Sequence, residues 1–139
     1  MRILFLSSEI EPFAKTGGLA DVAGSLPVAL ERKGLEVHLA MPKYPSVDSK
    51  KEGRIGKSIR VRFIENERFF KRPGLYGEKG KDYPDNLDRF SFFCRKVLEL
   101  LKEENLKVDL IHCNDWQTAL APVYLKTLFQ KDPFFKGIK

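Results

Sequence analysis

The N-terminal segment carries the pattern that most constrains the fold: an apolar run, a helical stripe and a second apolar run. Residues 2–8 are a short apolar stretch of the kind that makes a buried strand. Apolar side chains then recur at helical spacing, at Leu19, Val22, Ala23, Leu26 and Leu30. Gly34 is a good helix terminator, and residues 35–41 alternate as a strand does. This order predicts a β-α-β unit with parallel strands and a right-handed crossover.

The middle of the chain adds one more strand and a long helix. Residues 42–56 read as a polar loop, and residues 58–63 alternate strictly, as a half-exposed strand does. Residues 68–82 are rich in glycine, proline and aromatic side chains and read as a loop. A helix that we expect Asp85 or a neighbour to cap follows. Its apolar stripe consists of Leu87, Phe90, Cys94, Val97, Leu98 and Leu101.

The C-terminal part completes an alternating order of strands and helices. Residues 108–112 read as a short buried strand, and residues 117–130 read as a further helix. Pro122 is tolerable in that helix only near its first turn. The whole order predicts an α/β fold, a Rossmann-like three-layer sandwich around a largely parallel sheet.

Composition narrows the class of partner and the compartment. The chain has 25 Lys and Arg against 19 Asp and Glu, for a formal net charge of +6, which suits an anionic substrate and also nucleic acid. These charges are scattered among acids, which favours solvated faces. Cys94 and Cys113 lie far apart without C-x-x-C spacing, so we expect free thiols and no metal site. Early acids at Glu9 and Glu11 argue against a signal peptide, no run reaches transmembrane length, and we expect a cytoplasmic protein.

The segment around Gly17 and Gly18 has the features of a phosphate site. Glycines at the start of a helix let a ligand approach the backbone, and the first N–H groups of the helix have no internal partner. Lys15 adds a full positive charge. The alternative is a simple turn beside a solvated lysine, and spacing alone does not separate the two. No G-x-G-x-x-G is present, which disfavours an NAD-dependent oxidoreductase.

The candidate residues follow different strands but belong to one edge of the predicted sheet. Residues 15–18 follow the first strand, and residues 112–118 follow the last. Ligands of open parallel sheets bind beyond the carboxyl ends of the strands. We therefore expect a single site there, over which the loop containing Tyr76 and Tyr83 could fold.

Three segments in order resemble the bacterial glycogen synthases and plant starch synthases. The first is residues 8–27, SEIEPFAKTGGLADVAGSLP. The second comprises GLYG at 74–77, DYPDN at 82–86 and Arg89-Phe90, and the third is HCNDWQTA at 112–119. Three ordered motifs over nearly the whole chain are far more specific than any one of them.

The resemblance implies the N-terminal part of a two-lobe GT-B glycosyltransferase. Residues 1–139 would be a single, incomplete N-terminal domain, without the second lobe that grips most of the nucleotide. The complete enzyme would transfer glucose from ADP-glucose to the non-reducing end of an α-1,4-glucan such as glycogen, with retention. The resemblance implies no cofactor, metal, nucleic acid or membrane. The alternative for the chain alone is a catalytically inert carbohydrate- or nucleotide-sugar-binding fragment, and exposed truncated surface predicts self-association.

The resemblance also implies roles for the residues of the first motif. Lys15, Gly17 and Gly18 would bind the phosphates and glucose of the donor. Asp21 would bond a sugar hydroxyl in a catalytic position, or it is simply an acid placed favourably near a helix N-terminus.

In the third motif the family often has histidine where this chain has Asn114. Either His112 or Asn114 would contact the glucose, and His112 could instead be a core residue at a strand end. Asp115 is a candidate for binding sugar, and with Trp116 it could equally cap and pack the following helix. Tyr76 and Tyr83 would stack on glucan rings or pack the loop. These residues do not decide whether the donor is ADP-glucose or UDP-glucose.

Overall fold

The computed structural model describes residues 1–47 and 53–139. Its main strands are β1 (Arg2–Leu6), β2 (Glu36–Pro42), β3 (Arg54–Ile55), β4 (Ile59–Ile64) and β7 (Leu110–Cys113). Its helices are α1 (Gly18–Arg32), α2 (Glu67–Phe70), α3 (Asn86–Glu103) and α4 (Leu120–Lys126). Two 3-10 turns, η1 (Trp116–Thr118) and η2 (Pro133–Phe135), and a small hairpin of β5 (Gly77–Glu78) and β6 (Lys81–Asp82) complete the described elements.

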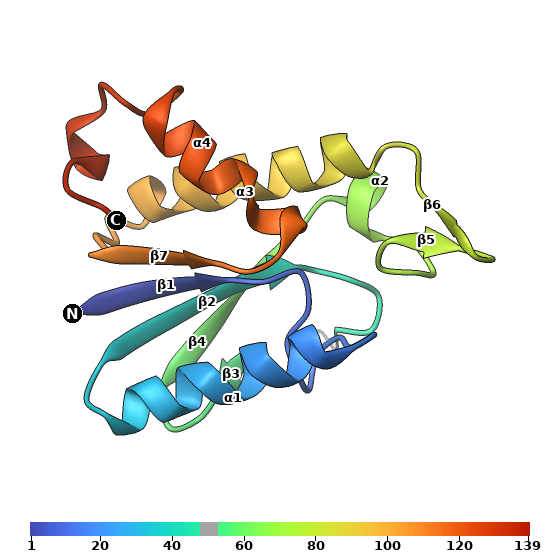
Figure 1. The fold of residues 1–139 in the computed structure, drawn as a ribbon, viewed down its shortest axis with the longest axis horizontal. Helices are drawn as coiled ribbons and strands as arrows, with labels where there is room; N and C mark the ends of the chain where they lie inside the picture. Colours follow the sequence, from blue (N-terminus) through green and yellow to red (C-terminus); the bar gives the residue numbers. More distant parts are fainter. Residues whose placement is uncertain (48–52) are drawn as a thin grey trace.

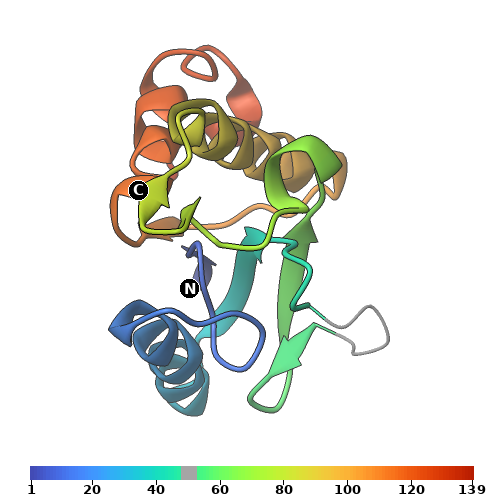
Figure 2. The same ribbon diagram turned by 90° about the vertical axis from the view of Figure 1, so that its right-hand side faces the viewer.

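The elements form the predicted three layers around a mostly parallel sheet (Figure 1). The sheet has five strands in the order β3-β4-β2-β1-β7, and β3 alone among them runs antiparallel to its neighbour. Helix α1 covers one face, while α3 and α4 lie over the other (Figure 2). The fold class predicted from the order of strands and helices is therefore confirmed.

Strand β1 lies between two parallel neighbours, which explains its unbroken apolar sequence. Leu4, Phe5 and Leu6 are fully buried. Leu6 is the register partner of Ala40 in β2 and of Cys113 in β7. A strand that is flanked on both sides and covered on both faces has no solvent-facing side, so strict alternation is absent.

The buried face of α1 differs from the predicted stripe. Ala23 is buried as predicted, but Val22 is 47% exposed and Leu26 is 37% exposed, and the other buried positions are Ala20 and Pro27. A Cβ at Gly24 would come within 2.9 Å of the Glu11 carbonyl oxygen. Small residues therefore form the contact face, because the chain between β1 and α1 lies directly against the helix.

Two segments predicted as loops contain short regular elements. Within residues 42–56, β3 pairs antiparallel with β4, while residues 48–52 lie outside the described part. Residues 68–82 contain the end of α2 and the β5–β6 hairpin. Asn66 caps α2 by accepting a hydrogen bond from the Phe69 amide at 3.1 Å. Elements this short are stabilised by a paired strand or a helix-capping residue, so the spacing of apolar residues in their own sequence does not predict them.

Helix α3 confirms the predicted long helix, with two corrections. Most of the predicted stripe is buried, but Leu87 is 72% exposed in the first turn. Asp85 occupies the N-cap position without a side-chain capping bond. Its carboxylate instead accepts two hydrogen bonds from the Arg72 guanidinium, at 2.7 and 2.6 Å.

The C-terminal segment is more broken than predicted. The helix expected over residues 117–130 is divided into η1 and α4, and α4 ends at Lys126, before the β-branched Thr127. Pro122 lies in the first turn of α4, where it removes no helical bond. Strand β7 is only partly buried because it forms the outer edge of the sheet.

Both cysteines are free, and Cys94 is buried as predicted. Burial raises the pKa of the Cys94 thiol to about 12 and that of the Cys113 thiol to about 11. Across residues 1–47 and 53–139, no helix is long and apolar enough to cross a membrane.

Candidate functional site

The site begins where β1 ends, in a buried polar segment. Ser7, Ser8 and Glu9 follow the last strand residue, and all three side chains are almost completely buried. The Ser7 amide continues the sheet by donating to the Ala40 carbonyl at 3.2 Å. The Ser7 hydroxyl donates to the Glu9 carbonyl at 2.7 Å. These bonds fix the direction in which the chain leaves the sheet.

The carboxylate of Glu9 joins the two loops that surround the site. The amide of Thr16 donates to one of its oxygens, and the Thr16 hydroxyl donates to the other at 2.8 Å. The Tyr76 hydroxyl also donates to this second oxygen, at 2.7 Å. Glu9 is only 3% exposed, so these donors replace the water that a carboxylate would otherwise bind.

The segment containing Lys15, Gly17 and Gly18 forms the N-terminal end of α1. Gly17 is the N-cap, and no side chain caps the helix, so its first amide groups have no side-chain partner. Neither glycine has a positive φ, and a Cβ at either would meet nothing within 4 Å. The space beside both glycines is therefore open, and no contact within the described residues requires glycine at these positions.

Asp21 lies beside Lys15 in the same half of the site. The Lys15 ammonium donates to an Asp21 carboxylate oxygen at 2.5 Å, and this bond raises the pKa of Lys15. Both side chains are largely exposed. The structure thus brings the four predicted residues of the first motif together at one helix end, with a cation and a carboxylate facing solvent.

The residues after β7 approach the same edge from the neighbouring strand. His112 is the register partner of Phe5 in β1, and their rings lie 4.5 Å apart. The Asn114 side chain donates to the Leu6 carbonyl at 2.7 Å, which ties the end of β7 to the end of β1. The Asn114 amide group is therefore engaged by the backbone, while the His112 side chain remains exposed.

Asp115 has the strained backbone of the site. Its φ of 63° and ψ of 179° lie in a region used almost only by glycine. Its carboxylate accepts a hydrogen bond from the Trp116 amide at 2.7 Å. Such conformations cost roughly 1–3 kcal/mol and cluster at functional sites.

The two predicted tyrosines have different positions. Tyr76 reaches the edge, where its hydroxyl also lies 2.7 Å from the Ser8 hydroxyl, and burial raises its pKa. Tyr83 instead stacks beneath the guanidinium groups of Arg72 and Arg89, at 4.8 and 4.9 Å. Its hydroxyl accepts a hydrogen bond from the Gly74 amide at 3.3 Å. Tyr83 therefore supports the loop that carries Tyr76.

Trp116, which the sequence analysis considered only as a packing residue, contributes an aromatic surface. Its ring packs edge-on against Phe90 at 5.0 Å and lies 6.2 Å from Tyr76. Half of the residue is nevertheless exposed. The sequence signal that could have identified Trp116 as a site residue is its position directly after the polar end of a strand. Glu9 was also missed, because its partners are distant in sequence.

The predicted convergence on one sheet edge is observed. Strands β1 and β7 are parallel neighbours, the two motifs follow their carboxyl ends, and the Tyr76 loop is bonded to Ser8 and Glu9. Among the described residues no group of three or more His, Cys, Asp or Glu side chains could hold a metal ion. Fold and geometry together define a Rossmann-like α/β domain with a cluster of polar side chains at the carboxyl ends of its parallel strands, the position at which open parallel sheets bind ligands.

Comparison with known proteins identifies the family to which this α/β domain belongs. The chain matches the starch synthase catalytic domain family over residues 2–139. It belongs to this family, and its sheet and helices match the GT-B architecture of such domains.

Individual relatives agree with this assignment. The chain is 42% identical over 160 residues to the glycogen synthase of Syntrophotalea carbinolica, covering 99% of this chain and 33% of that protein. It is 43% identical to the glycogen synthase of Geotalea daltonii, covering 97% and 33% of the two. The catalytic domain of starch synthase IV from Arabidopsis thaliana, solved with ADP and acarbose, superposes with a TM-score of 0.80 at 32% identity. That match covers 99% of this chain and 32% of the plant chain, so this chain spans about a third of the length of its relatives.

Proposed function

We propose that this chain is the acceptor-side N-terminal region of an ADP-glucose-dependent α-1,4-glucan synthase. In the complete enzyme, glucose passes from ADP-glucose to the 4-hydroxyl at the non-reducing end of glycogen, with retention. The observation that carries the proposal is the meeting of the Lys15–Gly18 segment and the His112–Asp115 segment at one edge. A family member that binds ADP and acarbose adds support.

The proposed donor half of the site is the N-terminal end of α1. Departure of the nucleoside diphosphate builds negative charge, which the uncapped amide groups near Gly17 and Gly18 would stabilise together with Lys15. Asp21 holds the Lys15 ammonium in place before the donor binds. In the proposal, Asp21 then accepts a hydrogen bond from a glucose hydroxyl.

The proposed sugar-binding half follows β7 and includes the Tyr76 loop. The exposed His112 imidazole would bond a glucose hydroxyl, and Asn114 would hold the strand end against β1. Asp115 would bond the sugar from its strained backbone. The half-exposed ring of Trp116 offers a face for the C–H surface of a sugar, beside Tyr76.

The proposal also covers organisation and location. Residues 1–139 would be part of the first of two lobes, and the second would bring most of the groups that bind the nucleotide. The two reduced cysteines fit a cytoplasmic protein. The proposed ligands are ADP-glucose and the glucan, with no role for nucleic acid.

The test is glucosyl transfer by the complete product of the gene that encodes this chain. Labelled glucose from ADP-glucose should enter glycogen, and a parallel reaction with UDP-glucose measures the preference of the base-binding groups. Residues 1–139 alone should incorporate no label above a blank, because transition-state stabilisation needs groups from both lobes. Absence of transfer from either donor by the complete protein would contradict the proposal.

Lys15→Ala tests the donor half within that enzyme. A charged contact to the diphosphate predicts about a tenfold to hundredfold loss in kcat/KM for ADP-glucose. Glucan affinity should change little, because in the proposal the acceptor lies on the other side of the glucose. The melting temperature should also change little, because the Lys15–Asp21 pair is exposed. The matched control is Lys71→Ala, which removes another exposed lysine, paired with Glu67 at 3.3 Å. Equal donor kinetics in both variants would make Lys15 a solvated loop lysine.

A further inference from the structure

Arg89, in the first turn of α3, carries a positive charge and is completely buried. Its guanidinium donates from Nε to the Phe69 carbonyl and from Nη1 to the side-chain oxygen of Asn86, both at 2.7 Å. Within residues 1–47 and 53–139, no carboxylate forms a hydrogen bond or an ion pair with it. Burial of a charge without a paired acid is costly. The role of Arg89 therefore lies in the groups that it holds.

The bond to Arg89 fixes the orientation of the Asn86 side chain. The two residues are three positions apart in α3 and lie on the same face of the helix. A guanidinium has donors and no acceptor, so the oxygen of the Asn86 amide group is the atom that faces Arg89. The NH₂ group of Asn86 then points to the neighbouring loop and donates to the Tyr76 carbonyl at 2.8 Å. Arg89 thus acts on the backbone of Tyr76 through Asn86.

The side chain of Tyr76 continues this connection to the proposed donor half of the site. Its hydroxyl donates to the Glu9 carboxylate at 2.7 Å, and the amide and hydroxyl of Thr16 donate to the same carboxylate. Thr16 directly precedes Gly17, the N-cap of α1. A series of hydrogen bonds therefore runs from Arg89 to the residue beside this helix end, by way of the backbone and the hydroxyl of Tyr76.

The same helix also supports the ring of Tyr76. Phe90, the neighbour of Arg89, lies 6.0 Å from the Tyr76 ring and 5.0 Å from the ring of Trp116. We propose that Arg89 is a positioning residue of the site: through Asn86 it holds the Tyr76 loop where Tyr76 and Glu9 fix the start of α1. The catalytic consequence of this placement rests on the proposed function, whereas the placement itself does not.

Arg89→Lys tests the positioning in the complete protein. Lysine keeps the charge, but one ammonium group cannot reproduce the fork that donates to Phe69 and Asn86 together. We expect kcat for transfer from ADP-glucose to fall at least about tenfold, because small misplacements of a site cost large factors in rate. KM for ADP-glucose should change by less than about threefold, since the groups proposed to bind the donor remain.

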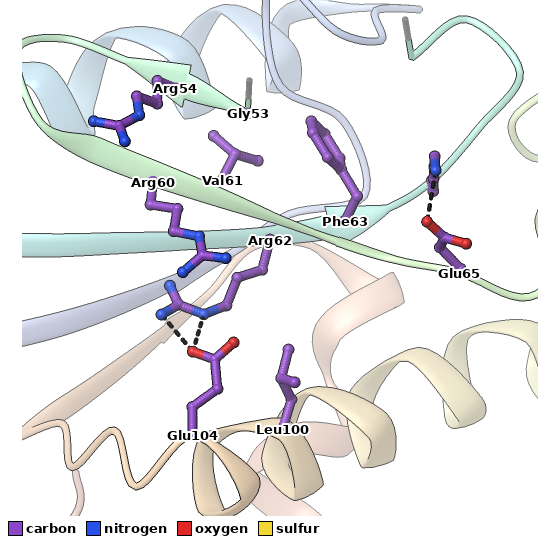
Figure 3. A pocket seen from close by; sticks show the side chains of 10 residues that line it. Gly53, Arg54, Arg60, Val61, Arg62, Phe63, Glu65, Leu100 and Glu104 are labelled. Carbon is purple, nitrogen blue, oxygen red and sulfur yellow. Dashed lines mark hydrogen bonds and ion pairs between the residues drawn. The ribbon is translucent and has the colours of Figure 1, made fainter. Parts of the chain in front are cut away.

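Arg62→Lys is the matched control, because it makes the same change at another buried arginine. Arg62 donates twice to one Glu104 oxygen, at 2.8 and 2.7 Å (Figure 3). Breaking this fork should lower the melting temperature and leave kcat unchanged. Equal losses of kcat in both variants would show a general effect of lost stability and overturn the proposal.

Asn86→Asp separates positioning from folding. The new carboxylate still accepts the bond from Arg89 and lies at the first position of α3, where an acid is favourable, so the melting temperature should not fall. It cannot donate to the Tyr76 carbonyl, so kcat should fall about as far as in Arg89→Lys. Combination with Tyr76→Phe should lose no more activity than the more damaging single variant, because both changes release one loop. Losses of kcat that multiply would overturn the proposal.

Trp116 reports the placement of the loop independently of activity. It is the one tryptophan of the 139-residue chain, and its ring lies 6.2 Å from that of Tyr76. Asn86→Asp should shift its emission to the red and increase quenching by acrylamide, and Arg62→Lys should do neither. If this shift appears while the complete unaltered protein transfers no glucose, the proposed function fails and the positioning stands. Unchanged emission, or an active protein whose Arg89→Lys and Asn86→Asp variants keep its kcat, overturns the positioning alone.

Discussion

At the scale of single residues, the geometry of the edge depends on a few buried polar groups. Glu9 accepts hydrogen bonds from Thr16 and from Tyr76, which is 67 positions further along the chain. Between them, these bonds set the positions of the helix end and of the aromatic loop. The surroundings of Gly17 and Gly18 are different, because a Cβ at either glycine would meet no protein atom within 4 Å.

Glu9→Gln should destabilise the chain. The side-chain amide would place an N–H₂ group toward donors that need an acceptor, leaving a buried polar group unsatisfied at about 1–3 kcal/mol. Urea unfolding followed by circular dichroism measures the change. Glu11→Gln is the control, since Glu11 is exposed two positions away and should alter stability by less than about 0.5 kcal/mol. Equal losses of stability in the two variants would mean that the Glu9 carboxylate does not hold the two loops together.

Alanine at the glycines of α1 should separate binding from folding. Gly17→Ala and Gly18→Ala should leave the melting temperature nearly unchanged, yet weaken use of the sugar nucleotide in the complete enzyme, because a Cβ would occupy the space of the ligand. Gly24→Ala should lower the melting temperature, since its Cβ would lie 2.9 Å from the Glu11 carbonyl oxygen. The reverse order of melting temperatures would contradict this assignment.

At the scale of elements, long periodic segments were predicted well and short ones were not. Strands β1 and β2 and helix α3 follow from their apolar spacing. Strand β3 exists only through its pairing with β4, so its own sequence carries no signal. The face of α1 was partly misplaced: Ala23 is buried as predicted, but Ala20 and Pro27 lie at helical spacing from it as well as the larger residues do, and they are the buried ones. Only the packed loop decides between the two stripes.

The same distinction applies to the site. Its position could be predicted, because motifs that follow parallel strands must meet at one edge. The hydrogen bonds of the Glu9 carboxylate could not be predicted, since they depend on tertiary contacts.

A pH response should arise from the contact between β2 and β4. His38 lies between Glu36, at 2.9 Å, and the Arg62 guanidinium, at 3.2 Å, and Arg2 also bonds Glu36. Burial, followed by smaller contributions that include Arg62, lowers the pKa of His38 below its usual 6.5. The unfolded chain then binds the proton more readily. Stability is complete above about pH 6.5 and is lost as the pH falls toward the lower folded pKa.

The measurement is the free energy of unfolding between about pH 7.5 and about pH 5.5. The contribution of His38 should lower it with a slope of at most about 1.4 kcal/mol per pH unit. His38→Gln, which retains an acceptor for Arg62, should flatten the curve. His112→Gln removes the other histidine and should preserve the fall; identical curves for all three proteins would exclude His38 as the source.

At the scale of the whole molecule, the two outer strands of the sheet differ, because Lys139 exchanges backbone hydrogen bonds with Ile111 and Asp109 at the outer side of β7, at 2.8 and 3.1 Å. β7 and β3 are the outer strands of the sheet. Several large apolar side chains are exposed, among them Leu87 at 72% and Leu128 at 61%. The family relatives are about three times as long as this chain, and more chain could cover such surfaces.

We predict that residues 1–139 alone self-associate, because exposed apolar side chains such as Leu87 and Leu128 favour pairing between copies. Sedimentation velocity over a range of concentrations should show a rising weight-average mass. A charge placed on the apolar surface, Leu128→Lys, should reduce this rise, whereas Lys126→Arg should not alter it. A concentration-independent monomer with a cooperative melt would contradict the prediction.

The central place of β1 also determines the order in which the protein can fold. Its pairing with β2 closes a short loop around α1, whereas its pairing with β7 joins residues such as Leu4 and Ile111, 107 positions apart. Closing the longer loop costs roughly 1 kcal/mol more in chain entropy. We therefore expect the β1–α1–β2 unit to form early and the pairing of β1 with β7 to form later. The edge at which we propose ligand binding would then be among the last parts of the chain to reach its native state.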